Sequence, residues 1–296
     1  MNIAARENID KAVKLLIRST GMIVIIILAG IFFMLLYNAI AFFLKVSPID
    51  FITGTQWNPS GRQASYGIVP LLVSTTLVTL GAMVIAIPLG IGTAAFISEY
   101  AGKRLKNILK PAIEMLAAVP SVAIGFLGIV IVGPFLARLI GQPNGLNALN
   151  GAILLSVMAL PTIITVTEDA LRGVPHSYKE ASYGIGANKW QTLTKVTIPA
   201  AAPGILAAIM LGIGRTIGET MTVLMATGNA QAFPHGFFRS VRTITATIAI
   251  ETGEVPYQTT HYFALFAIAT VLFIMTLVVN LIGEYFVNRF RKYHSA

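Results

Sequence analysis

The sequence predicts an all-α integral membrane protein with six transmembrane helices. Of the residues, 55% are apolar and only 11% are charged, whereas soluble domains carry about 25% charged residues. The apolar residues form long blocks, and the charged residues lie between those blocks. The spanning segments are expected to be helices because an open sheet edge would leave backbone groups without partners in lipid.

Six apolar blocks are long enough to cross the hydrocarbon layer, which takes about 20 residues. The first is about twice as long as a signal-peptide core and lacks a small-residue cleavage pattern, so we expect it to remain as an anchor. Glycines and prolines in the second and third blocks indicate a packed bundle with bends, although these residues are also commoner in membrane helices generally. The blocks are 19–44, 68–97, 108–139, 146–171, 200–227 and 261–287.

The basic residues predict that both termini are cytoplasmic. With the N-terminus inside, 15 of the 21 lysines and arginines fall on the cytoplasmic side, five fall outside, and Arg215 alone remains within the membrane. Such an excess inside is typical of bacterial membrane proteins. The chain then divides into a cytoplasmic tail, first helix and external loop (1–66), a core (67–288) and a basic cytoplasmic tail (289–296). The core contains a cytoplasmic loop at 172–199 and an external segment at 228–260. We expect the external segment to be a short helix at the outer mouth, a surface that meets a partner, or a plain capped loop.

Several kinds of chemistry leave no trace in the sequence. The net charge is +9, but the basic residues sit at the ends of apolar blocks and form no stripe, so nucleic-acid binding is not expected. There is no cysteine, no phosphate-binding G-x-x-x-x-G-K-[ST] motif and no G-x-S-x-G elbow, and the four histidines are scattered singly. We therefore expect no enzyme activity, metal site or cofactor in this chain.

The most informative connection is "RGVPHSYKEASYGIGANKWQTLTKVTIPAAAPGI", residues 172–205. It is far longer than the two to eight residues that join packed helices. Its composition predicts a short helix over 178–183, a bend at Gly184 and Gly186, and a second short helix over 189–196 that Pro199 ends. Such a compact knob is suited to docking into a groove on a partner protein.

Within this loop, "EASYGIG", nine residues and "VTIP" resemble the EAA signature of ABC importer permeases. The resemblance implies a type I ABC importer permease bundle whose loop docks on a cytoplasmic ATPase subunit. Glu180, Ala181, Ser182 and Gly186 would form that coupling site, with Ser182 replacing the second alanine of the signature. Gly186 is also compatible with a simple helix end.

The fifth block carries "GIGRTIGET", in which Arg215, Glu219 and Thr222 are spaced i, i+4, i+7 and Thr216 flanks them. On a continuous helix these residues form a polar stripe that faces a bundle interior or a pore. A packing pair between Arg215 and Glu219 is an alternative, but an arginine at mid-membrane costs about 2.5–3.5 kcal/mol on insertion, which favours a function. A guanidinium suits an oxyanion, phosphate especially, and Glu219 would hold the arginine when the path is empty.

The stretches "GRTIGETMTVLMATGN", "RTITATIAIETGE" and "AAVPSVAIGFLG" and the last block resemble the PstC-type permease family of phosphate ABC importers. The resemblance extends over about residues 66–285, although GR-x-x-GET is shared with the sister subunit. It implies a multi-pass protein of the bacterial cytoplasmic (inner) membrane. The implied partners are a PstA-type permease, a PstB-type ATPase dimer that uses ATP and Mg, a PstS-type external phosphate-binding protein and membrane lipid.

These observations predict a permease subunit of an ATP-driven, binding-protein-dependent importer of inorganic phosphate, with Arg215, Thr216, Glu219 and Thr222 along the path. One alternative is an ABC permease for another oxyanion, such as molybdate or sulfate. A second is a proton-coupled secondary carrier that uses Glu219 as its proton site. A third is a membrane scaffold or sensory subunit without transport of its own.

Overall fold

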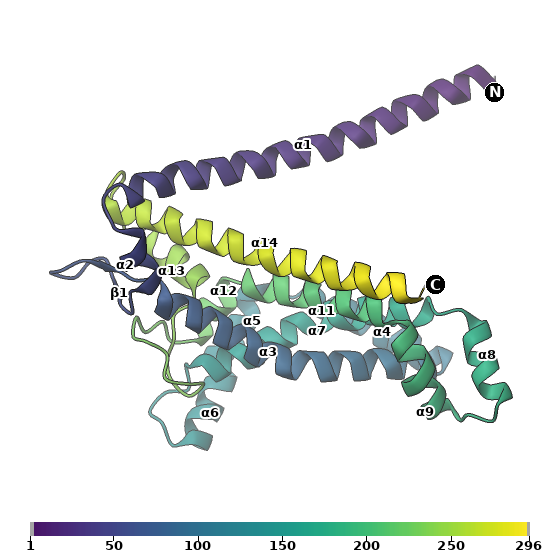
Figure 1. Ribbon diagram of the computed structural model, residues 1–296. Helices are drawn as coiled ribbons and strands as arrows, with labels where there is room; N and C mark the ends of the chain where they lie inside the picture. Colours follow the sequence, from purple (N-terminus) through teal and green to yellow (C-terminus); the bar gives the residue numbers. More distant parts are fainter. Residues whose placement is uncertain (1–2, 295–296) are drawn as a thin grey trace.

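The computed structural model describes the backbone of residues 3–294 and the side chains of residues 11–289 (Figure 1). Its described part is helical apart from loops and one short antiparallel hairpin, in which Trp57 of β1 lies opposite Tyr66 of β2. The elements are α1 (Ile3–Phe43), α2 (Pro48–Thr53), β1 (Trp57–Asn58), β2 (Ser65–Tyr66), α3 (Val69–Ala95), α4 (Lys103–Ala117), α5 (Ser121–Leu127), α6 (Gly133–Ile140), α7 (Ala148–Arg172), α8 (His176–Gly184), α9 (Lys189–Thr192), α10 (Ile198–Ala200), α11 (Ala202–Ile217), α12 (Met221–Ala226), α13 (Ile244–Glu251) and α14 (Thr260–His294). Short π-helical segments extend α3 over Phe96–Tyr100, join α5 to α6 over Gly128–Val132 and join α9 to α10 over Leu193–Thr197.

Five helical segments are long and apolar enough to cross a membrane, and a bent pair adds a sixth if it counts as one span. The bent pair is Lys189–Ala200 with Ala202–Ile217, at 70°. The predicted six-helix membrane bundle is therefore confirmed with the fifth member bent. The five straight spans are Lys11–Phe43, Val69–Tyr100, Ser121–Ile140, Ala148–Arg172 and Thr260–Arg289.

The predicted third span, 108–139, begins too early. The first part of that block belongs to α4, a separate helix that ends at Ala117, and the span itself starts at Ser121. Pro120 lies between the two helices and caps the second. A proline disfavours helical geometry in the residue before it, so the apolar run is divided at this point.

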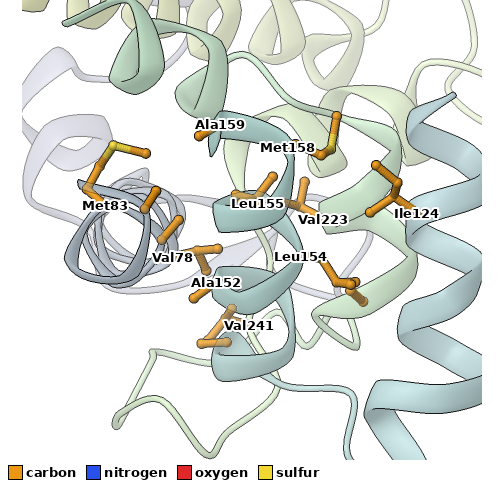
Figure 2. Close-up of a cluster of buried hydrophobic side chains, with 14 of the residues drawn as sticks. Val78, Met83, Ile124, Ala152, Leu154, Leu155, Met158, Ala159, Val223 and Val241 are labelled. Carbon is orange, nitrogen blue, oxygen red and sulfur yellow. The ribbon is translucent and has the colours of Figure 1, made fainter. Parts of the chain in front are cut away.

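The core of the bundle lies where α3 and α7 pack side by side. In Figure 2, Val78 and Met83 of α3 lie on one side of the α7 residue Leu155, and Ile124 of α5 and Val223 of α12 lie on the other. Glycines let these helices approach closely. At Gly90, for example, an added Cβ would lie 2.6 Å from the Ile163 side chain on α7.

The outermost helix, α1, packs against α14 at one end of the bundle and diverges from it toward its N-terminal end (Figure 1). Its side chains are largely apolar and exposed, as expected for a helix that faces lipid. The N-terminal end of α1 and the C-terminal end of α14 lie at the same end of the molecule as α8 (Figure 1). This placement agrees with two termini on the side of the predicted cytoplasmic loop, while the side itself remains a prediction.

The external segment contains a short helix, α13, which agrees with the first of the three alternatives for residues 228–260. The Thr243 side chain caps its first turn by accepting a hydrogen bond from the Ala246 N–H. At its other end the buried Glu251 carboxylate accepts from Trp57 Nε1 at 3.1 Å and from Arg242 Nη1 at 2.9 Å, and it lies 2.7 Å from His261 Nε2. Glu251 thus fastens the external segment to the β1–β2 hairpin and to the start of α14.

Candidate functional site

The first candidate region is a break in the fifth block, where the sequence predicts one continuous helix over 200–227. That prediction is wrong, because α11 ends at Ile217 and α12 begins only at Met221. The Thr245 hydroxyl donates to the Glu219 carbonyl at 2.8 Å, and a Glu219 carboxylate oxygen accepts from the Thr222 N–H at 3.2 Å. These bonds satisfy backbone groups that the interruption would otherwise leave without partners in the membrane.

The break separates the residues of the predicted polar stripe, so that they no longer share one face. Arg215 is exposed, and its Nη1 donates to Thr162 Oγ1 of α7 at 3.2 Å. Within the described residues no ion pair joins Arg215 to Glu219, whose half-buried carboxylate lies at the start of α12. The prediction of a single stripe over Arg215, Glu219 and Thr222 is therefore wrong, and Arg215 is the member that faces open space.

The two threonines of the predicted path are buried. Thr216 donates to the Gly212 carbonyl at 2.8 Å within α11. Thr222 donates to the Ser121 carbonyl at 3.1 Å and lies 3.0 Å from Met158 Sδ, so it fastens α12 to α5 and α7. In this arrangement both hydroxyls stabilise the helices around the break.

The exposed guanidinium of Arg215 can bind an anion. An arginine carries five N–H donors, and Thr162 accepts only one hydrogen bond from it. The remaining donors form a planar fork that matches the oxygens of a phosphate or carboxylate group. Thr162 could not be predicted from the sequence. Nothing in the residues around it, Pro161 included, indicates which neighbouring helix the α7 side chain contacts.

The second candidate region is the predicted cytoplasmic loop, where the two predicted short helices and the bend between them are confirmed. Pro199 does not end the second helix as predicted, because the helical run continues through α10 to Ala200. The first helix of the knob, α8, and its second, α9 with the π-helical turn after it, enclose the predicted helices within a residue or two. Gly186 has φ +88°, a conformation that L side chains rarely adopt, so it makes the bend between them. Asn188 and Gln191 form a reciprocal capping box that starts α9.

The four predicted coupling residues occupy different positions on this knob. Glu180, Ala181 and Gly186 are exposed, whereas Ser182 is buried and its hydroxyl lies 2.9 Å from that of Thr192. Ser182 therefore joins α8 to α9 inside the knob and is not available to a partner.

The exposed surface of the knob is unusually apolar. Ile185 is 88% exposed and Trp190 is 64% exposed, and Tyr178 and Tyr183 lie near them in the chain. Several large apolar side chains exposed on so short a segment favour a surface that meets another protein. The knob thus has the properties of a docking surface.

One ion pair joins the knob to the bundle, and others join α7 to α4. Lys179 of α8 binds Glu99, which follows α3, at 2.5 Å. The buried Glu168 of α7 binds Lys106 and Lys110 of α4 at 2.7 and 2.8 Å. The hydrogen bond to Glu168 raises the pKa of Lys110, so this lysine stays charged.

A bundle of membrane-length helices with a docking knob at one end and an exposed cationic side chain on a broken helix defines a membrane transport permease. The family model described as "Binding-protein-dependent transport system inner membrane component" matches residues 86–292. The chain belongs to this family of inner-membrane permeases.

Similar proteins include the probable ABC transporter permease protein YqgH of Bacillus subtilis, 38% identical over 82% of this chain and 79% of that protein. The phosphate transport system permease protein PstC of Mesorhizobium japonicum is 31% identical over 92% of this chain and 88% of its own length.

Among solved structures, a chain of a bacterial ABC transporter that imports alginate matches 96% of this chain and 99% of its own length, with TM-score 0.65 and 15% identity. A chain of the MetNI methionine ABC transporter, in an inward-facing conformation, matches 76% of this chain and 94% of its own length, with TM-score 0.56 and 21% identity. At these identities the two structures establish the fold, which is that of ABC importer permeases.

Proposed function

We propose that this chain is the permease subunit of an ATP-driven, binding-protein-dependent importer of inorganic phosphate. The observation that carries the proposal is the exposed guanidinium of Arg215 on the broken helix of a permease bundle. The choice of phosphate is supported by relatives named as phosphate permeases, one of which is similar over 92% of this chain. An oxyanion is the substrate class that an arginine fork recognises through paired hydrogen bonds.

Phosphate released from an external binding protein would pass Arg215 on its way to the cytoplasm. The guanidinium offers a fixed positive charge with several open N–H donors. Transport also requires release, and the nearby carboxylate of Glu219 opposes tight trapping of an anion. Thr216 and Thr222 would contribute by keeping the helices around Arg215 in place.

ATP hydrolysis would take place in a separate chain. The apolar knob around Glu180, Ala181 and Gly186 would dock on a cytoplasmic ATPase, which uses ATP and Mg. Closure of the ATPase dimer would move the knob, and the ion pair from Lys179 of α8 to Glu99 after α3 would transmit that movement to the bundle.

The full importer would contain a PstA-type permease, a PstB-type ATPase dimer and a PstS-type binding protein beside this PstC-type chain. The alginate importer with a similar fold has been solved in complex with its periplasmic protein, which supports an assembly of this general kind. Both termini of the chain would lie in the cytoplasm.

The test is transport by the complete complex in proteoliposomes, with labelled phosphate, an external binding protein and internal ATP. We expect uptake that requires all four kinds of subunit and that excess sulfate or molybdate leaves largely unchanged. Strong competition by one of these anions would favour the other-oxyanion alternative. Uptake without the ATPase that stops when the proton gradient collapses would favour a secondary carrier, and an absence of any uptake would favour a scaffold.

A further inference from the structure

We infer that Thr162 is a positioning residue for transport, because it holds the Arg215 guanidinium at the path and presents a second hydrogen-bond donor to the oxyanion. This inference rests on the proposed phosphate path past Arg215. It adds a residue from another helix, α7, which the sequence pattern around "GIGRTIGET" does not indicate.

The geometry of the contact supports a positioning role. Thr162 Oγ1 accepts from Arg215 Nη1 at 3.2 Å, across two helices that are 53 residues apart in sequence. Arg215 is exposed and Thr162 is half-buried, so the hydroxyl holds the guanidinium near the helix surface and leaves its other donors open. A long arginine side chain without such an anchor would have to lose rotamer freedom each time it bound an anion.

The helix that carries Thr162 is held rigidly at this level. Its neighbour Ile163 is fully buried between two glycines on different helices. An added Cβ at Gly90 of α3 would lie 2.6 Å from the Ile163 side chain, and one at Gly212 of α11 would lie 2.9 Å from it. Gly212 is also three residues before Arg215, so the same close contact fixes the arginine backbone relative to α7.

The hydroxyl group supplies chemistry that an apolar residue of the same shape would lack. When the Thr162 oxygen accepts from Arg215, its own hydrogen remains free to donate. Many threonine hydroxyls in this bundle donate a hydrogen bond to the carbonyl four residues earlier, as those of Thr216 and Thr227 do. Within the described residues, Thr162 makes no such bond, so its donor and the guanidinium can converge on one oxyanion.

The inference is tested with Thr162→Val and Thr162→Ser in the complete reconstituted complex, by measuring phosphate uptake and ATP hydrolysis together. Because the lost bond involves a charged group, we expect Thr162→Val to lower phosphate transported per ATP about tenfold. ATP hydrolysis stimulated by the loaded binding protein should stay within about twofold, since the knob is untouched. Thr162→Ser keeps the hydroxyl and should transport nearly normally.

Thr165→Val is the matched control, since it removes a half-buried hydroxyl one turn along the same helix. It should leave transport per ATP unchanged. The inference is overturned if Thr162→Val transports normally, if Thr162→Ser fails as badly as Thr162→Val, or if Thr165→Val has the same defect. Arg215→Ala in the same assay distinguishes the two proposals. Normal phosphate uptake by Arg215→Ala would contradict the proposed path past Arg215. Loss of uptake in Arg215→Ala together with normal uptake in Thr162→Val would contradict only the role of Thr162.

Discussion

The knob and the broken helix both interrupt helical runs, but they are stabilised over very different distances along the chain. The knob uses local contacts: the positive φ of Gly186, the capping box of Asn188 and Gln191, and the bond from Ser182 to a threonine ten residues away. The break at 218–220 uses a hydroxyl 26 residues away, and α12 is fastened through Thr222 to a carbonyl 101 residues away.

This difference indicates how the two regions respond to movement. A unit that holds itself together can be pushed as one body, which suits a part that receives force from an ATPase. A helix break held by distant segments changes when those segments move, which suits a part that must expose a binding residue to one side and then the other. We therefore expect the knob to move as one body, as a lever does, and the surroundings of Arg215 to change shape.

Loss of Arg215 should have the largest effect on phosphate transport and no effect on the docking of the knob on the ATPase. We expect Arg215→Ala to abolish phosphate uptake, because the exposed guanidinium is the proposed anion-binding group at the break. Assembly and the binding of the ATPase should persist, since the knob is distant from this side chain. Uptake assays combined with co-purification measure both, and Arg215→Lys should retain a small part of the activity because it keeps the charge without the planar fork. Near-normal uptake by Arg215→Ala would contradict an anion role.

A bulky residue at Gly186 should deform the knob and leave the surroundings of Arg215 unchanged. Gly186→Val forces a β-branched residue to adopt φ +88°, at about 1–2 kcal/mol or more, so the bend should deform and the ATPase should dissociate or hydrolyse ATP without transport. Recovery of the ATPase with the tagged permease measures this. Gly184→Ala is the control, because Gly184 has no positive φ and an added Cβ meets no atom within 4 Å. Unchanged recovery with Gly186→Val would count against docking through the knob.

Two changes at Glu219 separate its backbone role from its charge. Glu219→Gln keeps an oxygen that can accept from the Thr222 N–H but removes the negative charge that would oppose tight trapping of phosphate. We therefore expect normal thermal stability but lower uptake. Glu219→Ala removes the acceptor and should weaken the start of α12 by about 1 kcal/mol, which thermal unfolding of the purified complex would detect. Normal uptake by Glu219→Gln would show that the charge is not required, which would contradict both the release role and the proton site of the secondary-carrier alternative.

The smallest effect is expected at Ser182. Ser182→Ala leaves the buried Thr192 hydroxyl without its partner, at a cost of about 1 kcal/mol to the knob. The double variant Ser182→Ala with Thr192→Val removes both polar groups and should recover most of that stability. Thermal unfolding of the four members of this cycle gives the coupling energy, and strictly additive effects would show that the bond does not stabilise the knob.

Much of the fold could be predicted from the sequence because its signals are local. Long apolar blocks gave the spans, and their lengths follow from the thickness of the hydrocarbon layer. The bend of the knob followed from Gly186 and its neighbours, since turn chemistry acts over a few residues, but the helix end expected at Pro199 did not, because a proline is tolerated in the first turn of a helical segment. The length of the apolar run could not divide 108–139 into α4 and a later span. Over a short run, the apolar face of a surface helix has the same residue types as a membrane span.

The sequence by itself determined the membrane class of this protein and the knob. It also showed one arginine, Arg215, within a membrane segment, where an arginine is costly unless it has a function. Only the tertiary structure decided the side-chain partner of that arginine. Helical spacing placed Glu219 beside Arg215, but the hydroxyl of Thr245 holds the Glu219 carbonyl and breaks the helix between them. Arg215 meets Thr162 instead. The physical reason is that periodicity acts within one helix, whereas the hydrogen bonds that end a helix in a membrane come from whichever distant segment packs against it.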